Sequence, residues 1–239
     1  MTPEQTIEIL ALRSRSLTPK EIARKLGLRP AEVKALIQAQ SEQAAQDRLA
    51  RGEVAPVYEC LVSEDFPNNR FLTADKNRDL KIAKGDVSSG LTVVMVTRRE
   101  RPGKLSLCKY LVDYNCLGVK NVLGPVKVSE SDYPQLKSEY YSSFDNGEKQ
   151  ITLEQAQAIV FSSVAYADTL GLSPHKDFNE AARNHLGVWD EQLTIWCGNE
   201  DGKPLLVAGP YDSPARIMGI LNQTVGEGNY HYLVPADMF

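Results

Sequence analysis

The spacing of apolar residues changes near residue 55, and this change constrains the fold more than any other feature of the sequence. Before it, apolar residues recur every three or four positions, which is typical of amphipathic helices. After it, short apolar runs between turn residues predict β-strands. The 239 residues are enough for two domains. We therefore predict an α+β protein, with a small all-α helix-turn-helix head followed by a larger α+β domain whose sheet is mainly antiparallel.

The predicted domain boundaries follow the same change. We assign residues 1–40 to the helix-turn-helix and residues 56–239 to the α+β domain. Residues 41–55 between them are rich in Ala and Gln as far as Gly52, so they predict a helical linker rather than a flexible one.

Three helices are predicted in the head. The first covers residues 3–14, where Ile7, Leu10 and Ala11 recur at helical spacing. The second begins at a capping box made by Thr18 and Glu21 and ends at Gly27, with an inward face of Ile22, Ala23 and Leu26. The third begins at Pro30 and turns Val33, Leu36 and Ile37 inward.

Residues 18–37 resemble the helix-turn-helix of bacterial regulators and site-specific recombinases. In that motif the second helix enters the major groove of DNA. The resemblance implies DNA contacts by Thr18, Lys20, Arg29, Ala31, Lys34 and Gln38. Since Glu32 repels phosphate and few arginines are present, DNA binding implies a homodimer. The alternative is a helical module that contacts protein.

The charge distribution limits any nucleic-acid contact to the head. Residues 1–55 contain nine Lys or Arg and seven Asp or Glu, whereas the remainder contains 18 and 24. The body is therefore acidic and binds polyanions poorly. No apolar run approaches the length of a membrane helix, no signal peptide is recognisable, and the four cysteines form no CxxC pair. These features predict a soluble cytoplasmic protein without membrane contact.

The body combines strands and helices without a regular βαβ alternation or a glycine-rich phosphate loop. The predicted strands are residues 57–62, 91–99, 105–113, 193–197, 204–208 and 230–234, and the predicted helices are 131–143, 152–170, 177–185 and one that begins at Pro214. Strand 91–99 is apolar on both alternations, which indicates a central strand. Turns at 101–104 and 199–202 predict two hairpins. Residues 63–89 are polar and predict little regular structure.

Four segments of the body resemble a family of uncharacterised bacterial proteins that have a short helix-turn-helix before such a domain. They are residues 110–121 (YLVDYNCLGVKN), 174–178 (PHKDF), 209–212 (GPYD) and 225–234 (VGEGNYHYLV). The resemblance covers nearly the whole chain. It implies the two-part architecture but no activity, cofactor or site residue.

Cys116 is the strongest candidate for chemistry in the body. It follows a predicted strand and lies near Lys120, whose charge would lower the pKa of the thiol. An enzyme site would combine it with Asp113 and with His175 or His231 as base. The alternative for Cys116 is a small buried residue beside a glycine turn.

Two further sites have weak signals. His175 and Asp177, with Asp113 or Asp212, are candidate metal ligands, but they lack the spacing of a metal motif, so we predict no metal and no cofactor. Residues 226–229 either expose backbone N–H groups to an anion or end a helix. If the head binds DNA, we expect the body to sense a ligand, to bind a partner protein or to dimerise.

Overall fold

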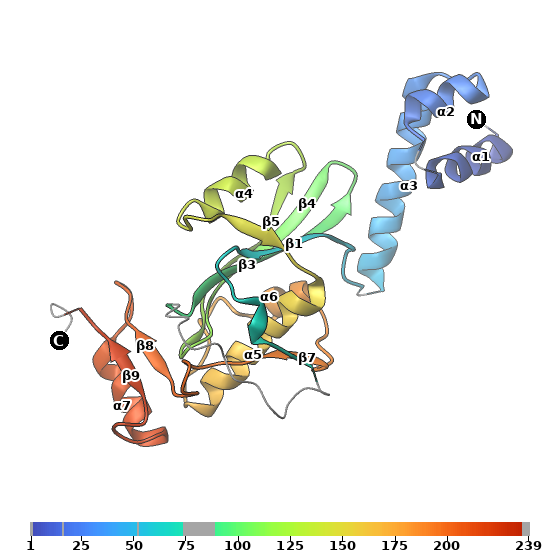
Figure 1. Cartoon of the computed structure of the whole chain (residues 1–239). Helices are drawn as coiled ribbons and strands as arrows, with labels where there is room; N and C mark the ends of the chain where they lie inside the picture. Colours follow the sequence, from blue (N-terminus) through green and yellow to red (C-terminus); the bar gives the residue numbers. More distant parts are fainter. Residues whose placement is uncertain (1, 16, 52, 74–88, 236–239) are drawn as a thin grey trace. The chain divides into compact units, whose positions relative to one another are not determined.

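The computed structural model describes residues 2–15, 17–51, 53–73 and 89–235. Its contacts divide the chain into two compact units, residues 1–56 with 99–104, and residues 57–98 with 105–239. We call residues 2–56 the head and residues 57–235 the body. Within the described part of the chain, seven α-helices accompany a mainly antiparallel five-stranded sheet, so the predicted α+β class is confirmed (Figure 1).

The head consists of three helices around a small apolar core. They are α1 (Pro3–Ser14), α2 (Pro19–Leu26) and α3 (Pro30–Ala50). The buried core residues are Ile9, Leu12, Ile22, Ala23 and Val33. The segment predicted as a helical linker is largely a continuation of α3, which runs to Ala50 without interruption.

Local chemistry sets the boundaries of α2. Thr18 Oγ1 accepts a hydrogen bond from Glu21 N–H at 3.3 Å, and Glu21 Oε2 accepts one from Thr18 N–H at 2.8 Å, which confirms the predicted capping box. Gly27 ends the helix at φ 68°, a left-handed conformation that glycine adopts without steric cost. Leu28 N–H then donates to the Ala23 carbonyl at 2.9 Å, so the chain reverses within three residues before α3.

The apolar residues whose spacing predicts α1 are not the ones that this helix buries. Ile7, Leu10 and Ala11 are exposed, and Ile9 and Leu12 are buried instead. Both faces of this helix carry large apolar residues, so the spacing allows either. Packing against α2 and α3 decides between them.

The body is built on a sheet with strand order β5-β4-β3-β1-β6. Its strands are β1 (Val57–Ser63), β3 (Leu91–Arg101), β4 (Lys104–Asp113), β5 (Gly118–Ser129) and β6 (Glu148–Gln150). β1 pairs antiparallel with both β3 and β6. The predicted turn between β3 and β4 is present, with Gly103 at φ 72°. β3 is the central strand, as its two-sided apolar pattern predicts.

Helices cover both faces of the sheet. On one face, α5 (Leu153–Thr169) and α6 (Glu180–Leu186) pack over a core that includes Val94 and Val96 of β3. On the other, α4 (Tyr133–Tyr141) covers a core that includes Val93 and Met95 (Figure 1). Tyr133, Tyr140, Tyr141 and Phe144 belong to this second core. Alternate residues of one strand thus enter different layers.

A third cluster lies at the C-terminal end of α5. It combines Cys116 and Leu117, which follow β4, with residues of α7 (Pro214–Thr224) and of β8 (Leu205–Val207). After α7, Gly226 N–H donates to the Leu221 carbonyl at 3.1 Å, and Asn229 N–H donates to the Gly226 carbonyl at 3.2 Å. These two bonds favour the interpretation of residues 226–229 as the end of a helix.

The prediction of a hairpin between residues 193 and 208 is wrong. The turn exists, because Asn199 N–H donates to the Lys203 carbonyl at 2.9 Å. However, β7 (Leu193–Ile195) pairs antiparallel with β2 (Phe71–Thr73), and β8 pairs parallel with β9 (His231–Leu233). Distant segments therefore supply the partners of both strands.

Two strands of the main sheet were not predicted. β5 is the longest, and its Gly124-Pro125 pair is typical of a turn, yet it forms one edge of the sheet. β6 has only three residues. In segment 63–89, a 3-10 turn (Asn68–Arg70) and β2 are present, and residues 74–88 lie outside the described part. None of the described helices is both long enough and apolar enough to cross a membrane.

Candidate functional site

The candidate DNA-contacting residues of the head are all on its surface, but Thr18 and Arg29 are engaged by neighbouring side chains. Thr18, Lys20, Arg29, Ala31, Lys34 and Gln38 are exposed. The hydroxyl of Thr18 accepts from Glu21 N–H and donates to the Glu21 carboxylate, so it serves the helix cap. Arg29 forms an ion pair with Glu32 one turn later, which cancels its charge locally. Among the six, Lys20 of α2 and Lys34 of α3 therefore offer positive charge at the surface. Ala31 and Gln38 also belong to α3.

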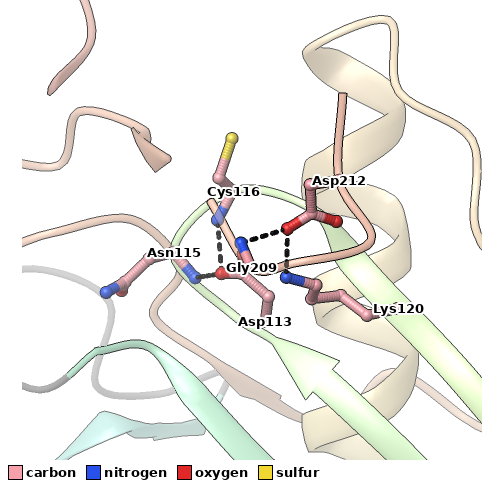
Figure 2. Close-up of polar contacts among 6 residues, drawn as sticks. All are labelled: Asp113, Asn115, Cys116, Lys120, Gly209 and Asp212. Carbon is pink, nitrogen blue, oxygen red and sulfur yellow. Dashed lines mark hydrogen bonds and ion pairs between the residues drawn. The ribbon is translucent and has the colours of Figure 1, made fainter. Parts of the chain in front are cut away.

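In the body, Asp113 organises the loop between β4 and β5. Its Oδ1 accepts hydrogen bonds from Asn115 N–H at 2.9 Å and from Cys116 N–H at 3.0 Å (Figure 2). The side chain is 3% exposed. Burial raises the pKa of Asp113 to about 7, although the charge of Lys120 and the backbone hydrogen bonds lower it. Asp113 thus carries a carboxyl that titrates near neutral pH inside the protein.

Cys116 is a buried thiol. Figure 2 shows its sulfur pointing away from the Asp113 carboxylate and from Lys120. Burial is the largest effect on the thiol and raises its pKa, the charge of Asp113 raises it further, and the opposing effect of Lys120 is smaller. A nucleophilic cysteine needs the reverse balance. This environment favours the alternative interpretation of Cys116, that of a small buried residue.

Lys120, at the start of β5, is paired with an acidic residue from a distant segment. Its Nζ lies 2.7 Å from Asp212 Oδ2, and each side chain is only 15% exposed. The same Oδ2 accepts a hydrogen bond from Gly209 N–H at 2.7 Å (Figure 2). Asp212 therefore holds Lys120 and closes the 209–212 turn simultaneously.

The candidate histidines lie in different places. His175 lines a pocket of about 380 Å³ together with Lys120 and Asp212. Its Nδ1 lies 3.5 Å from Asp177 Oδ2. His231 is on β9, with its Nε2 3.8 Å from Asp201 Oδ2. Among the described residues, no hydrogen bond or ion pair joins either ring to Cys116.

The structure thus brings together part of the predicted site. Lys120, His175 and Asp212 meet at one pocket, while Asp113 and Cys116 are buried in the loop between β4 and β5. In the part of the chain that the structure describes, no group of three His, Cys, Asp or Glu side chains is arranged to hold a metal ion.

One residue of the pocket could not be recognised from the sequence. Arg216 lies in the first turn of α7 and lines the pocket, but it belongs to none of the sequence motifs. Neither spacing nor composition distinguishes it from other exposed arginines. An indirect indication of the pocket exists in the sequence. Three of the segments that carry the family resemblance, residues 110–121, 174–178 and 209–212, each contribute lining residues to it.

Comparisons with protein-family models, with curated proteins and with solved structures give no match to this chain.

Proposed function

We propose that the head is a helix-turn-helix that binds double-stranded DNA. The observation that carries the proposal is the connection between α2 and α3, which spans residues 27–29 and contains a left-handed glycine. Turns of three or four residues with a glycine are typical of this motif. The small side chain of Ala23, 1% exposed, lets the helices approach closely. As a genome-binding protein, the chain would act in the cytoplasm of a bacterium.

In this proposal α3 enters the major groove. Ala31, Lys34 and Gln38 are exposed along its N-terminal half, where base edges are contacted in such motifs. Lys20, in the first turn of α2, contacts a backbone phosphate. Because Glu32 neutralises Arg29, the positive surface of one head is small, and a homodimer supplies the remaining affinity.

The test is fluorescence anisotropy of the full-length protein with a labelled random duplex, at about 50 and 200 mM salt. If three phosphates are contacted, the affinity falls about 40-fold between these two conditions. The variant Lys34→Glu binds about tenfold more weakly at the lower salt and shows a smaller salt dependence.

The matched control is Lys176→Glu, which makes the same charge change at an exposed position of the body. It retains the affinity of the wild type. Absence of wild-type binding at about 50 mM salt, or equal losses in the two variants, contradicts the proposal.

A second candidate function, contact with protein, is favoured by one observation. Ile7 and Leu10 of α1 are 69% and 37% exposed, although they belong to an ordered helix. Adjacent exposed apolar side chains of this size are typical of interaction surfaces. A second copy of the chain is the partner that would also satisfy the requirement for a DNA-binding dimer.

We expect Ile7→Lys to abolish self-association if this face joins two copies. Sedimentation velocity of the full chain measures the change, and Ile9→Val, a conservative change inside the core, leaves the dimer intact. A wild-type protein that sediments as a monomer at about 50 µM excludes this interface.

A further inference from the structure

A pocket of about 380 Å³ lies within the body between three segments that are distant in sequence. They are the start of β5, the loop that follows α5, and the first turn of α7 with the residues before it. This volume lies in the range of small-molecule sites. All of its lining residues belong to the body, so a ligand could bind there whether or not the head binds DNA.

Among the described residues that line the pocket, Arg216 is a cation for which no ion pair is found. Lys120 and Asp212 neutralise each other at 2.7 Å, and Asp212 is further held by Gly209 N–H. The pocket therefore favours a ligand with a single negative charge. A dianion would require Lys120 to leave its largely buried partner, which is costly.

The chemical character of the walls adds a second requirement. Ile217 and Ile220 of α7 line one side, and Leu172 lines another. Polar donors are present beside them, because Ser213 lines the pocket and its hydroxyl makes no capping hydrogen bond. The planar guanidinium of Arg216 matches a carboxylate, which it binds through two parallel hydrogen bonds.

We propose that this pocket binds a small amphipathic carboxylic acid. Arg216 and Ser213 hold the carboxylate, and the apolar part of the molecule lies against Leu172, Ile217 and Ile220. The Lys120–Asp212 ion pair forms part of the polar wall of the pocket and stays intact when the ligand binds. The body is then a sensor domain for a monoanionic metabolite.

The proposal is tested by isothermal titration calorimetry of the full-length protein with hexanoate, hexanamide, hexyl phosphate and acetate. Hexanoate binds with a Kd of about 1 mM, which is reasonable for a ligand of this size. Acetate binds about tenfold more weakly because it lacks the apolar chain. Hexanamide also binds about tenfold more weakly because it lacks the charge.

The variant Arg216→Gln loses about tenfold in affinity for hexanoate and none for hexanamide. The control Lys176→Gln removes a nearby exposed charge that does not line the pocket, and it binds hexanoate as the wild type does. Circular dichroism checks that both variants are folded.

Three results would overturn the proposal, and all of them need only the wild-type protein. One is the absence of saturable hexanoate binding, and another is equal affinity for hexanoate and hexanamide. The third is tighter binding of hexyl phosphate than of hexanoate. It would show that the pocket prefers a phosphate to a carboxylate, and it would contradict the inference that the ligand carries a single negative charge. None of these results bears on DNA binding by the head, so the two proposals fail separately.

Discussion

Replacing Gly118 with alanine will lower the free energy of unfolding of the body by about 3 to 4 kcal/mol. Gly118 has φ 68°, and a Cβ there would lie 2.9 Å from both Ala167 Cβ and the Ser163 carbonyl oxygen of α5. Left-handed strain contributes about 1 kcal/mol of the loss, and overpacking contributes the remainder. Urea denaturation followed by tryptophan fluorescence measures it, because Trp189 and Trp196 both lie in the body.

The matched control is Gly147→Ala. Gly147 has nearly the same backbone conformation, φ 73°, but a Cβ added at this position would have no neighbouring atom within 4 Å. This variant should lose only the strain contribution of about 1 kcal/mol. Equal losses of unfolding free energy at the two positions would show that a Cβ at residue 118 does not overpack the contact between β5 and α5.

Replacing Asp113 with asparagine will remove a pH dependence of stability of about 3 kcal/mol between pH 4 and pH 7. Burial raises the pKa of Asp113 from 3.8 to about 7, so the folded protein favours the protonated carboxyl. The protonated Asp113 carboxyl therefore contributes to the free energy of unfolding. This contribution is fully present below the unfolded-state pKa and is lost as the pH rises through the folded-state pKa. The asparagine side chain would keep an oxygen acceptor for the two N–H groups but cannot ionise.

Urea denaturation of both proteins across this pH range measures the difference. Wild type and Asp113→Asn should have similar stability near pH 4, and the variant should become progressively more stable than the wild type above it. Asp145→Asn, at an exposed carboxylate, should follow the wild-type profile. Parallel profiles for wild type and Asp113→Asn would mean that the buried carboxyl is not protonated in the folded protein.

Local hydrogen-bond chemistry made several features predictable from the sequence. The capping box of Thr18 with Glu21, and that of Thr152 with Gln155, which the sequence of the helix at 152–170 also predicts, each involve residues only three positions apart. Both partners are therefore present in any helix that begins there. The two-sided apolar pattern of β3 likewise indicated its central place in the sheet.

Features that depend on distant partners could not be predicted in the same way. The turn at residues 199–202 is local and was recognised, but β7 and β8 pair with β2 and β9, and nothing near them in sequence specifies these strands. The edge strand β5 was not predicted. Its Gly124-Pro125 pair is typical of a turn, and its place beside β4 depends on the whole sheet.

In the candidate site, too, the sequence alone was insufficient where distant residues decide the chemistry. Sequence proximity of Lys120 to Cys116 suggested a reactive thiol, but burial outweighs that charge and raises the pKa of the thiol. Lys120 instead binds Asp212, which is distant in the sequence. The sequence by itself determined where the capped helices α2 and α5 begin and which strand is central, because capping and apolar spacing act over a few residues. The predicted starts of α4 and α6, at residues 131 and 177, are earlier than those in the structure. Only the tertiary structure decided which apolar face is buried, which strands pair and which charges meet, because packing and burial depend on residues far apart in the chain.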